Sequence, residues 1–128
     1  PKGAEGARGI FAHLRRKGGI GLLSDQKMND GVAAPLFGRP AMTAPAAAQL
    51  ALRFDCPMIP VRTVRLGPAR IGVLIEPPLP RPAPGSRHED VALLTQAMNA
   101  HIEAWIRERP AEWLWLHRRF DKAIYRRA

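Results

Sequence analysis

The stretch GGIGLLSDQKMNDGVAAPLFGRPAMTAP, residues 18–45, decides the fold of this chain. Its apolar start, Ile-Gly-Leu-Leu, predicts a buried strand over residues 20–24. The run ends in a carboxylate and an amide, Asp25 and Gln26. The glycines and prolines that follow predict a long loop over residues 25–42, and long ordered loops are often functional.

A helix is predicted after this loop. Thr43 is a typical N-cap residue and Pro45 suits a first helical turn, so we expect a helix that continues to Phe54. In a strand–loop–helix unit, ligands bind beyond the carboxyl end of the strand. Asp25 and Gln26 occupy that position, where a carboxylate orients a hydroxyl or an arginine and an amide both donates and accepts. The simpler alternative is that Asp25 only caps the loop.

The flanking segments predict further regular elements. Residues 5–17 have one apolar face and predict a helix that ends at a glycine pair. Residues 58–65 and 70–76 predict two antiparallel strands joined by a turn. Residues 77–85 contain five prolines and predict a surface connector, with binding to a polyproline-recognising domain as the alternative.

A long helix and a basic tail are predicted to complete the chain. Ser86 and Glu89 have the spacing of a capping box, and Pro110 predicts the start of a last short helix. The basic tail runs from residue 118 to residue 127. Taken together, the elements predict an α/β fold, a layered domain or part of one. The long helix carries apolar residues at helical spacing, namely Val91, Leu94, Met98, Ile102 and Trp105.

Composition limits the kind of protein. A length of 128 residues suits one domain, and a single cysteine, Cys56, excludes an internal disulfide or a multi-cysteine metal site. No apolar stretch approaches the ~20 residues of a membrane span. The net charge of +9 favours an anionic partner, such as nucleic acid, an anionic membrane surface, an acidic carrier protein or a phosphorylated lipid. Specific nucleic-acid binding is disfavoured because no recognised binding motif is present.

The segment RERPAEWLWLHRRF, residues 107–120, combines tryptophans with arginines. This is the composition of a membrane-interface anchor, so Trp113, Trp115, Arg118 and Arg119 are candidate interface residues. The alternative is that the tryptophans pack the last helix on the core while the arginines stay in water. No metal site is expected, since the histidine of this segment has no partner at a ligand spacing.

Two motifs resemble a known family. GLLSDQKMNDG with PLFGRPAMTAPA, and the segment at residues 107–120, resemble the lauroyl/myristoyl acyltransferases of lipid A biosynthesis, and the resemblance runs over about residues 3–120. It implies a glycerolipid acyltransferase-like fold with a mixed sheet flanked by helices. It also implies transfer of a fatty acyl group from acyl carrier protein to a lipid A precursor, a phosphorylated glucosamine disaccharide, in lipopolysaccharide biosynthesis. The implied place is the cytoplasmic face of the bacterial inner membrane, and no metal or redox cofactor is implied.

The resemblance also implies roles for individual residues. Asp25 and Gln26 correspond to a block that positions the acyl acceptor. Lys27 and Arg39 flank the same loop and are candidates to pair with a phosphate of the acceptor. Arg8 lies in the family-like stretch KGAEGAR and is expected to face the site or the carrier protein. For these three cations, ordinary solvated surface charge is the alternative.

One family signature is absent from the sequence. The catalytic base of these enzymes is a histidine followed five positions later by Asp or Glu, and none of His13, His88, His101 and His117 has that neighbour. We therefore expect residues 1–128 to be the C-terminal part of an acyltransferase domain, inactive alone, with residues 107–128 as a signature helix and basic tail. The alternatives are a non-catalytic, basic membrane-surface or partner-binding module and, less favoured, a nucleic-acid-binding module.

Overall fold

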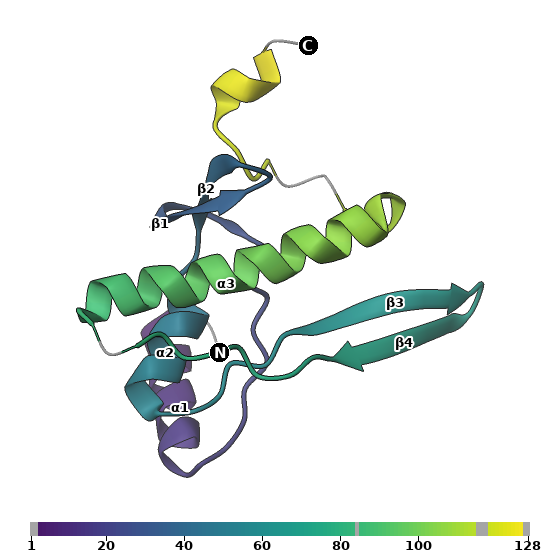
Figure 1. Cartoon of the computed structure of the whole chain (residues 1–128). Coiled ribbons are helices and arrows are strands. Elements are labelled where there is room, and N and C mark those ends of the chain that lie inside the picture. Colours follow the sequence, from purple (N-terminus) through teal and green to yellow (C-terminus); the bar gives the residue numbers. More distant parts are fainter. Residues whose placement is uncertain (1–2, 84, 115–117, 127–128) are drawn as a thin grey trace.

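The computed structural model describes residues 3–83, 85–114 and 118–126 (Figure 1). Within these ranges the chain forms three α-helices and two separate antiparallel pairs of strands. The predicted α/β class is confirmed, but the described strands form two small sheets and not one mixed sheet. In chain order the elements are α1 (Gly3–Arg15), β1 (Lys27–Leu36), β2 (Arg39–Thr43), α2 (Ala46–Phe54), β3 (Val61–Gly67), β4 (Arg70–Ile75), α3 (Arg87–Glu108) and the 3-10 helices η1 (Pro110–Glu112) and η2 (Lys122–Arg126).

Helix α3 is the central element, with the β1–β2 hairpin on one side and α1 and α2 on the other (Figure 1). The predicted capping box begins it: the backbone N–H of Glu89 donates to Ser86 Oγ at 3.3 Å, and the Ser86 N–H donates to Glu89 Oε2 at 3.2 Å. This exchange satisfies two backbone N–H donors that would otherwise lack a partner at the start of the helix. Of the predicted apolar face of α3, Val91, Leu94, Met98 and Ile102 are buried and Trp105 is partly buried; Ile106, which was not predicted, is buried as well.

The long loop predicted over residues 25–42 is wrong, because most of that stretch forms the β1–β2 hairpin. Phe37 and Gly38 form its two-residue turn with φ angles of 53° and 70°. Positive φ at both positions matches the twist of paired strands. Pro35 and Pro40 face each other across the hairpin. Prolines lack an N–H and weaken the sequence signal for a strand, which explains the wrong prediction.

The predicted strand over residues 20–24 is not formed either. These residues are irregular, and Leu23 is 83% exposed. A strand needs a neighbour to pair its backbone groups, and in the part of the chain that the structure describes no strand lies along this segment. Asp25 and Gln26 therefore stand just before β1 and not at the carboxyl end of a strand.

Thr43 ends a strand and does not cap a helix. Its Oγ1 donates to the carbonyl of Ala41 at 2.9 Å, and its side chain is 2% exposed. Helix α2 begins at Ala46, with Pro45 at the N-cap position and no side-chain capping bond. The predicted N-cap is thus wrong, because the Thr43 hydroxyl is engaged inside the core.

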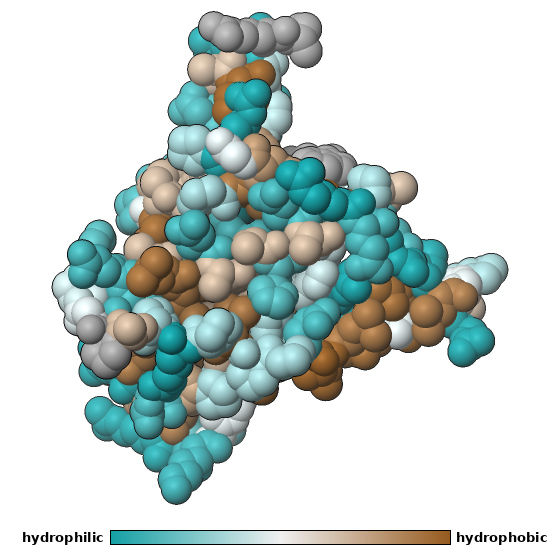
Figure 2. All heavy atoms as spheres, viewed as in Figure 1, coloured by the Kyte–Doolittle hydropathy of each residue, from teal (hydrophilic) through white to brown (hydrophobic). Residues whose placement is uncertain are grey.

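The β3–β4 hairpin confirms the two predicted antiparallel strands and extends away from α1 and α2 (Figure 1), while Arg62 on β3 contacts Glu108 and Trp105 of α3. Val64 on β3 is buried against the body. Most of the other apolar side chains of the hairpin are open to solvent, as the brown band along it in Figure 2 shows. The exposed apolar side chains of β3 and β4 are Val61, Leu66, Ile71, Val73, Leu74 and Ile75.

We expect Ser86→Ala to lower the free energy of unfolding by about 1 kcal/mol, because it removes the N-cap acceptor of α3. Chemical denaturation followed by circular dichroism measures the change. Ser86→Asp keeps an acceptor at the N-cap and serves as the matched control, with stability close to that of the unsubstituted chain. Equal losses in both variants would contradict the capping role.

Candidate functional site

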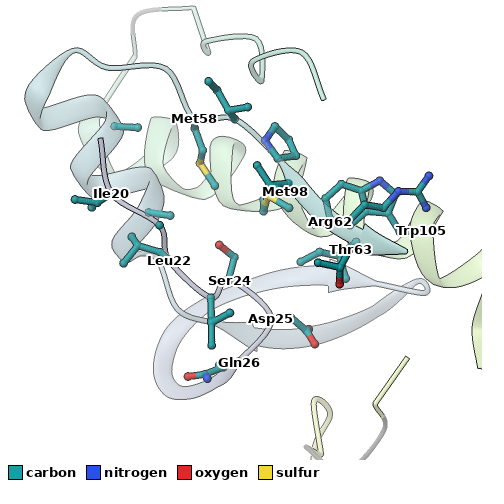
Figure 3. Close-up of a pocket in the computed structure, with 18 of the residues that line it drawn as sticks. Ile20, Leu22, Ser24, Asp25, Gln26, Met58, Arg62, Thr63, Met98 and Trp105 are labelled. Carbon is teal, nitrogen blue, oxygen red and sulfur yellow. The ribbon is translucent and has the colours of Figure 1, made fainter. Parts of the chain in front are cut away.

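A cavity of about 610 Å³ opens between the segment before β1, helix α2, strand β3 and helix α3 (Figure 3). Its volume lies within the range of small-molecule sites, roughly 300–1,000 Å³. Figure 3 shows that Asp25, Thr63 and Arg62 gather toward one end, whereas Ile20, Leu22 and Met58 lie toward the other. The cavity therefore has a polar end and an apolar end.

The end of helix α1 directs residues 20–26 along the cavity. Lys17 adopts a left-handed conformation with φ of 61°, its N–H donates to Leu14 O at 2.9 Å, and the Gly18 N–H donates to His13 O at 3.0 Å. This pair of bonds is a Schellman motif, which ends a helix and reverses the chain. A Cβ at Gly18 would lie 2.2 Å from His13 Nε2, so any other residue there would require the exposed His13 side chain to move.

The apolar part of the cavity is lined by aliphatic and thioether side chains from four elements. They come from the reversed segment, from α2, from the entry to β3 and from the buried face of α3, and include Ile20, Leu22, Leu50, Met58, Met98 and Ile102. Flexible methionines adapt to the shape of an apolar ligand. This part of the cavity suits a hydrocarbon chain.

Arg62 is the cation at the polar end, and its position is fixed by neighbours. Its Nη1 lies 2.7 Å from Glu108 Oε2, and its guanidinium carbon lies 5.6 Å from the ring centroid of Trp105. Glu112 also lines this end, and the hydrogen bond from Arg109, with a second from the backbone N–H of Arg65, lowers the pKa of the Glu112 carboxyl. Glu112 is thus an anion at neutral pH.

Asp25 lines the same polar end and forms an ion pair with Arg119. The distance from Arg119 Nε to Asp25 Oδ1 is 2.9 Å. The Arg119 side chain is 4% exposed, whereas that of Asp25 is 28% exposed. The carboxylate is therefore anchored from inside the protein and still reaches the cavity.

A buried polar cluster surrounds this arginine, and we define it as Thr43, Asn99 and Arg119. The Nδ2 of Asn99 is 3.0 Å from Thr43 Oγ1 and 3.3 Å from the carbonyl oxygen of Ala34. Arg119 Nη2 donates to Thr43 Oγ1 at 3.2 Å and to Asn99 Oδ1 at 3.5 Å. All three residues are at most 3% exposed. Their hydrogen bonds replace those they would make with water.

The other predicted acceptor-binding residues are dispersed. Gln26 lines the cavity beside Asp25. Lys27 is partly buried and its Nζ donates to the carbonyl of Phe120 at 3.4 Å. Arg39 is exposed at the hairpin turn and borders a second, apolar hollow of about 420 Å³. Arg8 is exposed on α1 and lines neither hollow.

The predicted membrane-interface residues lie in different environments. Trp113 is half-buried and lines the cavity, and Arg118 is exposed above the Tyr125 ring at 5.6 Å. The expectation of a surface position is wrong for Arg119, which is drawn inward by Asp25. Trp115 lies outside the described residues.

Two residues, Arg62 and Asn99, were not predicted from the sequence, although their spacing from apolar neighbours carried a signal. Arg62 lies on the same face of an extended segment as Pro60 and Val64, and both of those residues are buried. The charged side chain of Arg62 is therefore on the inward face. Asn99 lies one helical turn before the buried Ile102 and four residues after the buried Thr95. A charged or amide side chain on a buried face is rare unless it is paired, so each pointed to a polar partner.

Within residues 3–83, 85–114 and 118–126, no helix is both long enough and apolar enough to cross a bilayer. The same ranges contain no cluster of three or more His, Cys, Asp or Glu side chains arranged to hold a metal ion.

Comparison with protein families identifies the class to which this fold and cavity belong. The family described as bacterial lipid A biosynthesis acyltransferase matches residues 1–122, nearly the whole chain. The chain therefore belongs to this acyltransferase family of the lipid A pathway. No curated protein matches it.

We expect Asn99→Ala to lower the free energy of unfolding by about 1–3 kcal/mol, since it removes the buried hydrogen bonds that the Asn99 amide makes with Thr43, Arg119 and the carbonyl of Ala34. Urea denaturation gives the value. Gln96→Ala, at an exposed position on the same helix, is the matched control and should change stability by no more than about 0.5 kcal/mol. Equal stability of the two variants would contradict the role of the buried polar cluster.

Proposed function

We propose that this chain is the acceptor-side part of a lipid A acyltransferase, which moves a fatty acyl group from acyl carrier protein to a phosphorylated glucosamine disaccharide. The observation that carries the proposal is the cavity with one apolar and one polar end in a member of this family. A fatty acyl chain fills the apolar end. The sugar hydroxyl that receives it lies at the polar end, beside Asp25 and Gln26.

The reaction requires a base. The oxygen of the acceptor hydroxyl attacks the thioester carbonyl, a C–O bond forms, and the C–S bond to the carrier breaks. A base accepts the proton of the hydroxyl, and the carrier leaves as a thiol after it is protonated. General-base catalysis contributes roughly 10²–10⁴-fold to such a step. No histidine of these 128 residues has an acidic residue five positions on, so we assign the base to chain outside them.

The strand pairs described here also support the proposal that the chain is part of a larger domain. A layered α/β acyltransferase domain needs a larger sheet than the two strand pairs described here. The irregular apolar segment at residues 20–24 and the exposed apolar side chains of β3 and β4 are the surfaces that such a sheet would cover. We propose that these surfaces pack against the remainder of the domain.

We assign the predicted binding cations, Lys27, Arg39 and Arg8, to two different partners. Lys27 follows Asp25 and Gln26 directly and is our candidate for a phosphate of the acceptor. Arg39 and Arg8 are exposed away from the cavity, and we assign them to the acidic carrier protein.

A membrane-surface module is the second candidate, and the exposed β3–β4 hairpin favours it. Its apolar side chains stand beside the exposed Arg65 and Arg70, and Arg118 adds positive charge on the C-terminal segment. Apolar side chains next to cations suit the surface of an anionic membrane, such as the cytoplasmic face of the inner membrane. Lipid binding by this hairpin would persist when the cavity is filled, which separates the two candidates.

We expect the 128-residue chain to bind the acceptor disaccharide without transferring an acyl group to it. Mass spectrometry of the acceptor after incubation with lauroyl-acyl carrier protein measures transfer. A lipid A acyltransferase that carries a His-x-x-x-x-Asp or -Glu block is the positive control and should give acylated disaccharide. Transfer by the 128 residues at the rate of that enzyme would refute the assignment of the base.

Filling the cavity should weaken binding of a fatty acyl probe. Ala47 on α2 lines the cavity, and Ala47→Phe displaces part of the hydrocarbon chain. Loss of contact for two methylenes costs about 1.6 kcal/mol, which is more than tenfold in Kd. Titration with a fluorescent lauroyl probe measures the change. Ala46→Phe, at an exposed position outside the cavity lining, is the matched control and should bind like the unsubstituted chain. Unchanged affinity in Ala47→Phe would remove the cavity from the proposal.

A further inference from the structure

Arg119 links the C-terminal segment to the polar end of the cavity. Its Nε lies 2.9 Å from Asp25 Oδ1, and this is the contact by which the segment after η1 reaches a cavity-lining carboxylate. Opposite charges at this distance attract each other, and burial of the guanidinium reduces the screening of that attraction by water. The position of the Asp25 carboxylate therefore depends on the position of the Arg119 guanidinium.

The guanidinium itself is held on its other edge. Nη1 donates to the carbonyl of Met42 at 3.3 Å, and Nη2 faces Thr43 Oγ1 at 3.2 Å and Asn99 Oδ1 at 3.5 Å. These acceptors belong to β2 and α3, the most buried elements of the chain. A planar guanidinium fixed at both of its outer nitrogens directs its Nε in one direction.

Stability alone does not explain an arginine at this place. Burying an ion pair removes two charges from water, and apolar residues of similar volume often give equal or greater stability. The feature that apolar residues would not reproduce is an oriented, charged carboxylate at the cavity edge. Asp25 keeps 28% of its side chain exposed there while it is paired.

We propose that Arg119 is a positioning residue: it holds the Asp25 carboxylate in one orientation at the polar end, where that carboxylate accepts a hydrogen bond from a hydroxyl of the acceptor sugar. Arg119 is buried behind Asp25 and does not touch the sugar. The inference rests on the proposed function, because it takes the sugar to lie at this end of the cavity. It adds a residue of the C-terminal signature to the acceptor site.

A double-mutant cycle on acceptor affinity tests this proposal. The probe is an acylated, phosphorylated glucosamine disaccharide in detergent micelles, titrated calorimetrically into the 128-residue chain. Asp25→Asn and Arg119→Gln should each weaken binding by about tenfold, the usual loss for a hydrogen bond to a charged group. The double variant should lose about tenfold and not about a hundredfold, because Arg119 acts only through Asp25.

Two controls separate positioning from folding. Arg118→Gln removes an adjacent, exposed guanidinium and should leave acceptor affinity unchanged. The fluorescent lauroyl probe should bind Arg119→Gln as well as it binds the unsubstituted chain, since the apolar end is lined by other residues. Loss of both ligands together would indicate a general structural defect and overturn the proposal.

The remaining outcomes are also decisive. Wild-type acceptor affinity in Arg119→Gln, or a hundredfold loss in the double variant, overturns the role of Arg119 and leaves the proposed function standing. No binding of the disaccharide by the unsubstituted chain overturns the proposed function itself. Where circular dichroism shows that Arg119→Gln is unfolded, Arg119→Lys replaces it: this variant keeps the charge without the planar fork, and it should weaken binding only when Asp25 is intact.

Discussion

The buried polar cluster is the constraint on which the rest of the structure depends. Thr43, Asn99 and Arg119 come from β2, α3 and the C-terminal segment, and hydrogen bonds join each side chain to the other two. A buried polar group without a partner costs roughly 1–3 kcal/mol of stability. Moving any one of the three segments away would therefore be costly, because it would remove hydrogen bonds from buried polar groups of the other two. The cluster thereby fixes the hairpin and the C-terminal segment on one helix.

The cavity follows from this arrangement. Asp25 forms an ion pair with Arg119, a member of the cluster, and this contact holds the irregular segment before β1 against α2 and α3. Ile20 and Leu22 of that segment line the cavity together with residues from the buried side of α3, and the polar residues Asp25 and Gln26 lie at the far end. One chain reversal after α1 and one ion pair therefore give the cavity both an apolar and a polar end. Such a division suits a substrate with a hydrocarbon chain and a sugar.

Local signals in the sequence predicted local structure. The capping box at Ser86, the apolar spacing of α3 and the β3–β4 hairpin were all predicted from neighbouring residues, and all are present. The stretch over residues 18–45 was predicted wrongly because its structure depends on distant partners. Phe37 and Gly38 form a turn with an unusual first residue, and prolines in both strands conceal the hairpin. The family resemblance, which rests on the same stretch, was confirmed.

The candidate site was predicted in part for the same reason. Asp25 and Gln26 do line the cavity, although the strand expected before them is absent from the described residues. The arginine that meets Asp25 lies in the C-terminal signature, and no spacing rule connects two positions so far apart in the chain. The tryptophans and arginines near Arg119 in the sequence favoured a surface position, and only the fold shows that its side chain points inward.

The central claim is that the cavity holds a fatty acyl chain with its reactive end near Asp25. Photo-crosslinking with a lauroyl probe that carries a diazirine at its methyl end, followed by peptide mass spectrometry, tests it most directly. The account predicts labels on the apolar lining, at Ile20, Leu22, Met58 or Met98. Labels confined to the exposed face of β3 and β4, or to the hollow beside Arg39, would contradict it.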